Sequence, residues 1–285
     1  MKNLFVSMTF TATCAILAVA QESGPPPVIQ ILRESIKEGR SAAHEKVETD
    51  YARMFRKNKF PFHYIALTSM TGPGEVWFVS AYPSFAAVEQ GDKELQKPGF
   101  KAENDLLDSR DGEVRSISRS MYAVYRKDMS FHPEQANIGK TRYVSIESFR
   151  VKLGHTEDFM TGSKMFISAF EKANIKEPML AYQVVAGAPA GLFLFIQPME
   201  SLKTLDEMPA REKALADAMG AENFQRMMKG AGDVFTSIEN SLFAVNPKIS
   251  YVSKETEDAD PAYWRPKVTS TKPAADTKVA EKTGQ

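Results

Sequence analysis

The alternation of apolar and polar positions predicts the same series of elements twice along the chain. Each series opens with an alternating strand, at residues 28–35 and 142–149, followed by a glycine turn and a helix of about 17 residues. Ser41 and Thr156 stand where the N-caps of these helices are expected. Two strands around a glycine- and proline-rich turn come next, then a longer and less regular helical region, then a closing strand. The order β-α-β-β-α-β therefore predicts a duplicated α+β unit.

Residue matches in the same order along both halves support this duplication. Residues 35–57 align with 150–172, and residues 61–84 align with 178–201. The tripeptide AEN occurs at 102–104 and at 221–223, and the closing strands read SISRSMYAV at 116–124 and SIENSLFAV at 237–245. This last alignment sets Arg119 opposite Asn240 and Tyr122 opposite Phe243. No third copy is evident, so the pattern indicates a duplicated domain and not a repeat array.

The apolar positions also indicate how the two units pack. Phe159, Phe166 and Phe170 recur at spacings of seven and four, which places them on one helix face. The strand LFLFIQ, residues 192–197, is apolar on both faces, so we expect helices on one face and a second sheet on the other. We therefore predict an α+β fold of two tandem ferredoxin-like units, packed sheet to sheet as an intramolecular pseudo-dimer.

This pattern resembles the dimeric α/β-barrel superfamily, which includes antibiotic-biosynthesis-monooxygenase-like and NIPSNAP-like domains. The resemblance rests on strand order and apolar pattern, and it covers about residues 27–252. It implies an α/β barrel with both halves in one chain. Members of the superfamily include cofactor-free oxygenases, haem-degrading enzymes, isomerases and stress proteins, so the fold alone does not select a function.

The two ends of the chain differ in composition from the duplicated units. Residues 1–20 carry Lys2, an apolar stretch and the sequence AVA before Gln21, which predicts a signal peptide and a periplasmic or secreted protein. A retained membrane anchor is the alternative. Cys14, the only cysteine, lies inside this segment, so no disulfide is expected in the mature chain. We predict copy 1 at 27–131, a linker at 132–140, copy 2 at 141–252 and a disordered tail at 265–285.

Charge and motif content argue against several classes of partner and cofactor. The chain has 36 basic and 36 acidic residues, and this balance argues against nucleic acid and, after signal cleavage, against a membrane as partners. The sequence contains no phosphate-binding loop and no nucleophile elbow. None of the four histidines stands in a haem motif, so we predict no cofactor.

Copy 1 carries more polar aromatic residues than copy 2, which makes it the better candidate for a ligand site. His63 is expected to share a strand face with Ile65 and Leu67, either as a core histidine or as an acid–base group or ligand contact. Arg119 falls on an otherwise apolar strand face, where it either extends its head into water or receives a carboxylate or phenolate. We predict a ligand site made of His63, Tyr64, Arg119 and Tyr122.

One helix of copy 1 raises the question of a metal site. His44 and Glu48 stand four residues apart, so they share a helix face and could ligate an ion. A zinc-protease helix needs a second histidine where this chain has Glu48. We interpret this face as solvated, with Glu45 and Lys46 beside it, and predict no metal site.

Two main functional hypotheses follow. The first is a non-catalytic protein that binds a small apolar or aromatic ligand or associates with itself as a homo-oligomer. The second is an enzyme resembling cofactor-independent monooxygenases or isomerases, acting on an aromatic or polyketide-like substrate through His63 or Arg119 with a tyrosine. A third hypothesis is a partner protein bound at free sheet edges. A closed cavity lined by His63, Tyr64 and Arg119 would favour a ligand or substrate site, whereas an interior filled by Trp77 and methionines would favour a structural role.

Overall fold

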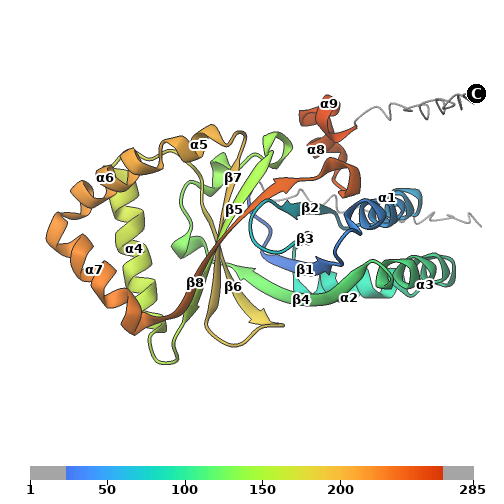
Figure 1. The fold of residues 1–285 in the computed structure, drawn as a ribbon, viewed down its shortest axis with the longest axis horizontal. Coiled ribbons are helices and arrows are strands. Elements are labelled where there is room, and N and C mark those ends of the chain that lie inside the picture. Colours follow the sequence, from blue (N-terminus) through green and yellow to red (C-terminus); the bar gives the residue numbers. More distant parts are fainter. Residues whose placement is uncertain (1–23, 266–285) are drawn as a thin grey trace, which may run out of the picture.

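The computed structural model describes residues 24–265, which form a closed antiparallel barrel with helices on two sides (Figure 1). The strand order around the barrel is β1-β3-β2-β8-β5-β7-β6-β4. Each copy contributes four strands, which confirms the prediction of two ferredoxin-like units in one chain. The predicted signal segment lies outside the described residues, as does the predicted tail after Arg265. Among residues 24–265, no helix is both long and apolar enough to cross a membrane.

The elements follow the predicted order in both copies. Copy 1 contains β1 (Val28–Ile36), α1 (Ser41–Lys57), β2 (Tyr64–Ser69), β3 (Glu75–Tyr82), α2 (Phe85–Leu95), α3 (Pro98–Gly112) and β4 (Arg115–Tyr125). The connection carries the short 3-10 turns η1 (Lys127–Met129), η2 (Pro133–Gln135) and η3 (Ile138–Lys140). Copy 2 contains β5 (Tyr143–Val151), α4 (Thr156–Lys172), β6 (Leu180–Ala186), β7 (Leu192–Met199), α5 (Lys203–Asp206), α6 (Met208–Met219), α7 (Ala221–Val234) and β8 (Phe235–Val245). The turn η4 (Pro247–Ile249) and the helices α8 (Lys254–Ala259) and α9 (Pro261–Trp264) follow.

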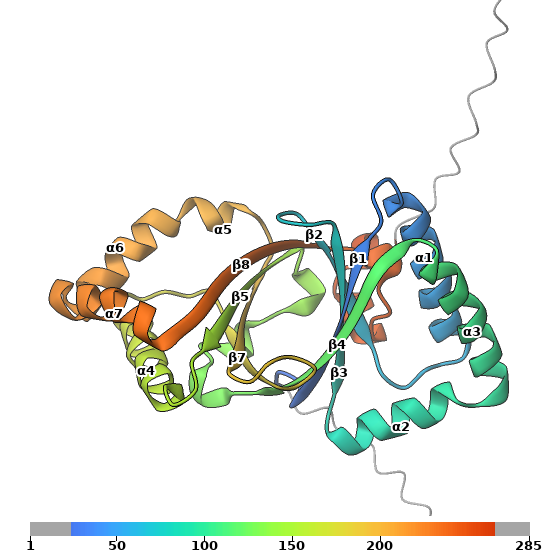
Figure 2. The ribbon, with the colours of Figure 1, turned by 60° about the horizontal axis from the view of Figure 1, so that its bottom comes forward.

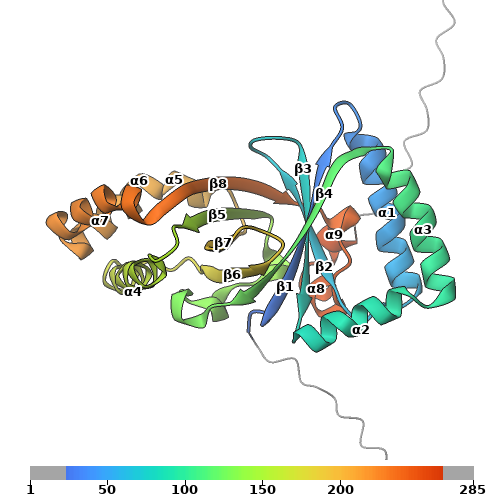
Figure 3. The ribbon, with the colours of Figure 1, turned by 90° about the horizontal axis from the view of Figure 1, so that it is seen from below.

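The helices of the two copies cover opposite sides of the barrel, with α1–α3 on one side and α4–α7 on the other (Figures 2 and 3). Gly39 and Gly154 supply the expected turns before α1 and α4, since both have positive φ. The predicted N-caps are wrong, because Ser41 and Thr156 are the first helical residues. The residue before α1, Arg40, already has a backbone near the helical region, whereas a capping side chain needs extended backbone.

Side chains from alternate strand positions fill the barrel. Ile31 of β1, Trp77 of β3 and Leu194 of β7 belong to one buried cluster that occupies the interior. Phe193 and Phe195 of β7 face the other way and pack beneath α4. The strand predicted to be apolar on both faces is therefore buried on both faces. The barrel holds a packed core and not a pore, as small closed barrels generally do.

The closing strands of the two copies correspond with a shift of one residue from the sequence alignment. Arg33 of β1 pairs with Arg119 of β4, and the equivalent Ser148 of β5 pairs with Glu239 of β8. Arg119 therefore corresponds to Glu239, and its predicted match with Asn240 is wrong.

The predicted match of Tyr122 with Phe243 is wrong for the same reason. Tyr122 faces outward and packs near α2, whereas Phe243 lies in the barrel interior. Successive residues of a strand point to opposite faces, so a shift of one residue exchanges inside for outside. The resemblance of the two closing strands in sequence is real, but it does not mark equivalent positions.

The two copies join along two short seams. β2 pairs with β8 over three residue pairs, from Leu67–Val245 to Ser69–Phe243, and β4 pairs with β6 over four. Within copy 1, β1 pairs with β3 over eight residue pairs. Most of the strand pairing therefore lies inside each copy, and the barrel is closed by comparatively few hydrogen bonds.

The segment after β8 closes the end of the barrel at which β8 finishes, where α8 and α9 lie near α1 (Figure 1). Trp264 is 2% exposed, packs into the barrel cluster and donates its Nε1–H to the Gly139 carbonyl at 2.9 Å. The Tyr263 hydroxyl donates to the Val245 carbonyl at 2.6 Å, and the Arg142 guanidinium lies 3.7 Å from the Tyr263 ring centroid. The sequence pattern predicted no element at 253–264.

Candidate functional site

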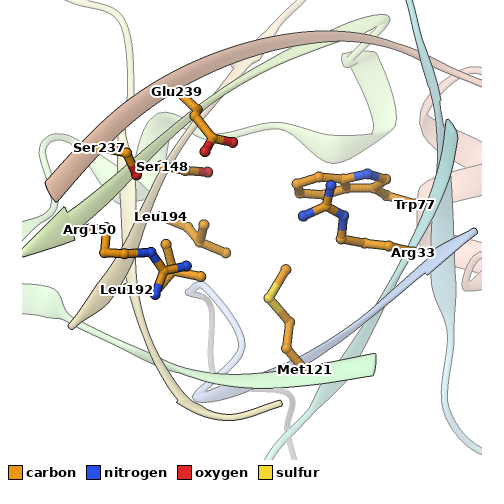
Figure 4. A pocket seen from close by; sticks show the side chains of 9 residues that line it. All are labelled: Arg33, Trp77, Met121, Ser148, Arg150, Leu192, Leu194, Ser237 and Glu239. Atoms are coloured by element: carbon orange, nitrogen blue, oxygen red, sulfur yellow. The ribbon is translucent and has the colours of Figure 1, made fainter. Parts of the chain in front are cut away.

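The opposite end of the barrel holds a cavity of about 50 Å³, and we call this end the barrel mouth (Figure 4). The cavity has room for a few water molecules. Its wall combines apolar side chains with charged ones from both copies, so it is chemically mixed. The lining residues are Arg33, Trp77, Met121, Ser148, Arg150, Leu192, Leu194, Ser237 and Glu239.

Arg33 is held in one orientation at the mouth. Its guanidinium lies against the Trp77 ring, with Cζ 4.3 Å from the ring centroid (Figure 4). Arg33 Nη2 donates to Glu75 Oε2 at 2.9 Å, and Trp77 Nε1 donates to the same oxygen at 2.8 Å. A cation is attracted to the face of a tryptophan, and the shared carboxylate fixes both partners. Arg33 is 37% exposed along its side chain, so part of this ordered cation faces solvent.

Glu75 is the anchor of this arrangement. Burial by itself raises the pKa of Glu75, but the hydrogen bonds from Trp77 and Arg33 outweigh burial and bring that pKa below its ordinary value. Glu75 is therefore ionised at neutral pH, and its charge is used to position Arg33. It is not a group with a proton to exchange in that range.

Two further arginines stand around the same opening. Arg119 is the strand neighbour of Arg33, so it shares the inward face of β4, and it is exposed at the rim. Arg150 on the opposite wall donates Nη1 to the Pro189 carbonyl at 3.0 Å. Glu239 lies across the cavity from Arg33 and Trp77 (Figure 4). With Glu75 included, the three arginines exceed the two carboxylates, so the mouth favours an anion.

The four residues of the predicted ligand site do not form one pocket. Arg119 is at the mouth, but Tyr64 is buried beneath α1, with its ring centroid 5.6 Å from that of Phe55. Tyr122 faces outward beside α2. His63 precedes β2, and its ring centroid lies 4.8 Å from that of Tyr251. The four side chains therefore lie in different layers of the fold, since Arg119 and Tyr122 are on opposite faces of β4 and Tyr64 is on the outward face of β2.

Arg33 and Arg150 are site residues that the sequence analysis did not single out. A signal for Arg33 was present, since it follows Ile29 and Ile31 at strand spacing and must share their inward face. The same reasoning identified Arg119 as an arginine on an apolar face. Two arginines with this pattern on strands of one copy indicate a common site once the strands are known to pair.

Comparisons with known proteins agree with this architecture. No protein-family model matches the sequence, and no curated protein is found to be similar to it. A candidate monooxygenase from Fusobacterium nucleatum superposes with a TM-score of 0.50 at 10% identity, over 78% of this chain and 93% of that chain. The chain has the dimeric α/β-barrel fold.

Two other solved structures superpose less closely. An anthrone oxidase-like protein gives a TM-score of 0.49 at 11% identity, over 80% of this chain and 95% of that chain. A haem-binding protein from Thermus thermophilus gives 0.43 at 10% identity, over 79% and 95%. At such identities, likeness between dimeric α/β barrels reports a shared fold and says nothing of a shared activity.

The histidines of this dimeric α/β barrel do not suit a haem in its interior. The interior is filled by Trp77, Met121 and their neighbours, and no histidine belongs to that cluster. An axial ligand for a haem inside the barrel is therefore missing among the four histidines of the chain. They lie beneath α1 (His44), beside Tyr251 (His63), beside Phe131 (His132) and at the start of α4 (His155).

His63 provides a prediction on pH. Burial lowers the pKa of His63, and Glu257 offsets this only in part. Because protonation is then easier in the unfolded chain, unfolding free energy should fall as pH drops below about 6.5. NMR titration of the His63 ring should show a midpoint below about 6.5, and the variant His63→Gln should show a flatter loss of stability from about pH 7 to 5. A midpoint above about 6.5 would mean that the charge of Glu257 affects the pKa of His63 more than burial does.

The interpretation of His44 and Glu48 as a solvated helix face is wrong. His44 is 1% exposed and Glu48 is 5% exposed, because α1 turns this face toward β1 and α3. There they meet Glu34 and Asp111, and the ligand atoms of all four lie within 4.8 Å of one another. Burial, and then the charges of Glu34 and Asp111, raise the pKa of Glu48 well above its ordinary value. Burial, followed by the Glu34 charge, raises the pKa of Asp111 to about 6.

Proposed function

We propose that this protein is a non-catalytic binding protein whose barrel mouth holds the carboxylate of a small organic ligand with an aromatic or apolar body. The observation that carries the proposal is Arg33, fixed on the Trp77 ring by Glu75 before any ligand arrives. A guanidinium presents a planar pair of donors that matches a carboxylate, and prior orientation reduces the entropy lost on binding.

The walls of the mouth suit the body of such a ligand. Met121, Leu192 and Leu194 provide apolar surface next to the arginines. Trp77 and Met121 already occupy the space behind them, so the ligand lies in the opening and not deep inside the barrel. This filled interior also favours binding over catalysis, since the lining of the mouth includes no histidine or tyrosine to move a proton. With residues 1–20 as a signal peptide, we propose that the site works outside the cytoplasm.

The two tryptophans of the chain give a direct test by NMR, since Trp77 is at the mouth and Trp264 is at the other end. Benzoate should shift the Trp77 indole N–H signal and leave that of Trp264 unchanged, whereas benzamide, of equal size but neutral, should shift neither. The variant Trp264→Phe assigns the two signals. Equal shifts with benzoate and benzamide would contradict recognition of a carboxylate.

Arg119→Ala should weaken benzoate binding about tenfold, because one charge-assisted contact is lost. Within residues 24–265 the Arg119 side chain is exposed and makes no hydrogen bond or ion pair, so its removal should leave stability within about 0.5 kcal/mol of the parent. The matched control is Arg226→Ala, an exposed arginine on α7. Unchanged benzoate affinity in Arg119→Ala would rule out its role. Native mass spectrometry of protein from its own host would identify the natural ligand and the oligomeric state together.

A further inference from the structure

Four titratable side chains of copy 1 are buried together between the barrel and its helices, and we call Glu34, His44, Glu48 and Asp111 the polar quartet. Glu34 lies on the outward face of β1, and Asp111 lies near the end of α3. His44 and Glu48 stand one turn apart on α1. Their exposed fractions run only from 1% to 5%. Three separate elements therefore aim ligating atoms at one buried point.

The spacing of these atoms suits a small cation. His44 Nε2 lies 2.9 Å from Glu34 Oε2, 3.6 Å from Asp111 Oδ1 and 4.0 Å from Glu48 Oε1. Ligand atoms around a four-coordinate Zn²⁺ are about 3.4 Å apart, given bonds of about 2.0–2.2 Å. Asp111 Oδ1 is buried and has no hydrogen-bond partner. An unpartnered carboxylate oxygen in such a place is costly, and it points at the imidazole nitrogen of His44.

Charge in the polar quartet is not balanced by protein groups. Arg115 is the nearby cation, with Nε against Asp111 and 3.6 Å from Glu34 Oε1. One guanidinium serves three buried carboxyl groups, and ionising all three together is costly at these distances. A divalent cation would remove this imbalance and satisfy Asp111 Oδ1 at the same time.

Copy 2 shows that the fold does not need charged groups at this place. The positions equivalent to Glu34 and His44 hold Phe149 and Phe159, whose ring centroids are 5.8 Å apart. Phe235 occupies the position equivalent to Arg115, and its ring centroid lies 5.3 Å from that of Phe149. The same scaffold is thus held by an aromatic cluster in one half. The polar quartet replaces a stabilising apolar arrangement, which indicates a role other than packing.

An open cavity at the surface reaches one member of the polar quartet, His44. His44 lines an open cavity of about 180 Å³ between the start of α1 and the end of β2. Glu45 and Glu75 also line it, so its wall attracts cations. The volume admits an ion with several waters, whereas the barrel mouth is at the other side of the sheet.

We propose that the polar quartet binds one divalent transition-metal ion, through the imidazole of His44 and the carboxylates of Glu34, Glu48 and Asp111. A mixed set of one nitrogen and several oxygen ligands suits Mn²⁺, Fe²⁺ or Zn²⁺ and contains no soft sulfur ligand. Zn²⁺ binds more tightly than Mn²⁺ in the general order of affinities, so Zn²⁺ is the strongest probe. The polar quartet and the barrel mouth lie on opposite faces of β1, at Glu34 and Arg33.

The test is titration of the chelator-treated full chain with ZnCl₂, MnCl₂ and MgCl₂, followed by calorimetry and thermal unfolding. Zn²⁺ should bind at one ion per chain and raise the melting temperature, with Mg²⁺ at least about 100-fold weaker. The variants His44→Gln and Glu48→Gln should each weaken Zn²⁺ binding by about 100-fold or more. Glu89→Gln is the matched control, since Glu89 is an exposed carboxylate of copy 1 that pairs with Lys93 and lies on α2.

Two outcomes separate a metal site from a purely structural charge cluster. Without metal, Glu48→Gln should be as stable as the parent or more so, because it removes one of three crowded acidic groups. If Zn²⁺ protects His44→Gln and Glu48→Gln as strongly as the parent, binding occurs elsewhere and the proposal fails. It fails equally if the parent shows no saturable binding of Zn²⁺ or Mn²⁺.

Discussion

Replacing Trp264 with alanine is expected to lower the free energy of unfolding by about 3–5 kcal/mol. Trp264 is 2% exposed and continues the core of the barrel, although it lies beyond the last strand. Truncation would leave a cavity against the barrel and remove the donor that the Gly139 carbonyl now accepts from. Urea unfolding followed by circular dichroism measures the change.

The control for this prediction is Leu153→Ala, at a leucine that is 85% exposed. Its effect should stay within about 0.5 kcal/mol, because an exposed apolar side chain contributes little to folding. If the two variants unfold alike, the segment carrying α8 and α9 is not part of the cooperative unit. A much larger loss for Trp264→Ala than for Leu153→Ala would show that the segment up to residue 264 unfolds together with the barrel.

Gly191→Ala is the second substitution with a large expected effect, about 3 kcal/mol or more. Gly191 has φ +83°, and a Cβ built there would lie 2.2 Å from the Val151 carbonyl oxygen. That contact is with backbone of the neighbouring strand, which is held by the hydrogen bond from Val151 N–H to the Gly191 carbonyl. Relief of the clash therefore requires β5 and β7 to separate.

Copy 1 supplies an internal control for the glycine prediction. Gly74 occupies the equivalent place and accepts the equivalent hydrogen bond, from Ile36 N–H. A Cβ on Gly74 would meet nothing within 4 Å, and its φ is not positive. Gly74→Ala should therefore change the melting temperature little, while Gly191→Ala lowers it by several degrees or more. Equal losses would show that the hairpin of copy 2 relaxes more easily than its packing indicates.

The sequence pattern was sufficient to predict the architecture because each element occurs in both copies. Helical spacing of apolar residues predicts α1 and α4, and a continuous apolar run predicts the strand β7. The glycine turns mark where α1 and α4 begin. The closing strands were harder. The identical residues of β4 and β8 suggested one alignment of the two strands, but their pairing with β1 and β5 shifts it by one residue. Only this pairing decides which residues face the barrel interior.

The buried position of His44 could have been inferred from the second copy. Phe159 was assigned to the buried face of its helix, and the alignment places His44 at the same point of α1. A residue aligned with a core phenylalanine is expected to be buried as well. Glu34 and Asp111 could not be added in this way, because they come from β1 and α3 and meet α1 only in the folded chain. Sequence spacing reports neighbours on one element, not those gathered from three.

The two short seams have a consequence for how the chain folds. Pairing within copy 1 joins residues at most 96 positions apart, Val28 with Val124, whereas the β2–β8 seam joins Leu67 with Val245, 178 positions apart. Contacts between distant residues form late because the loop entropy must be overcome first, so each half can assemble as an open sheet before the barrel closes. During that interval the edges of β2 and β4 are unpaired. Strands β8 and β6 of a second chain fit these edges equally well, so refolding at high protein concentration favours barrels that exchange halves between chains.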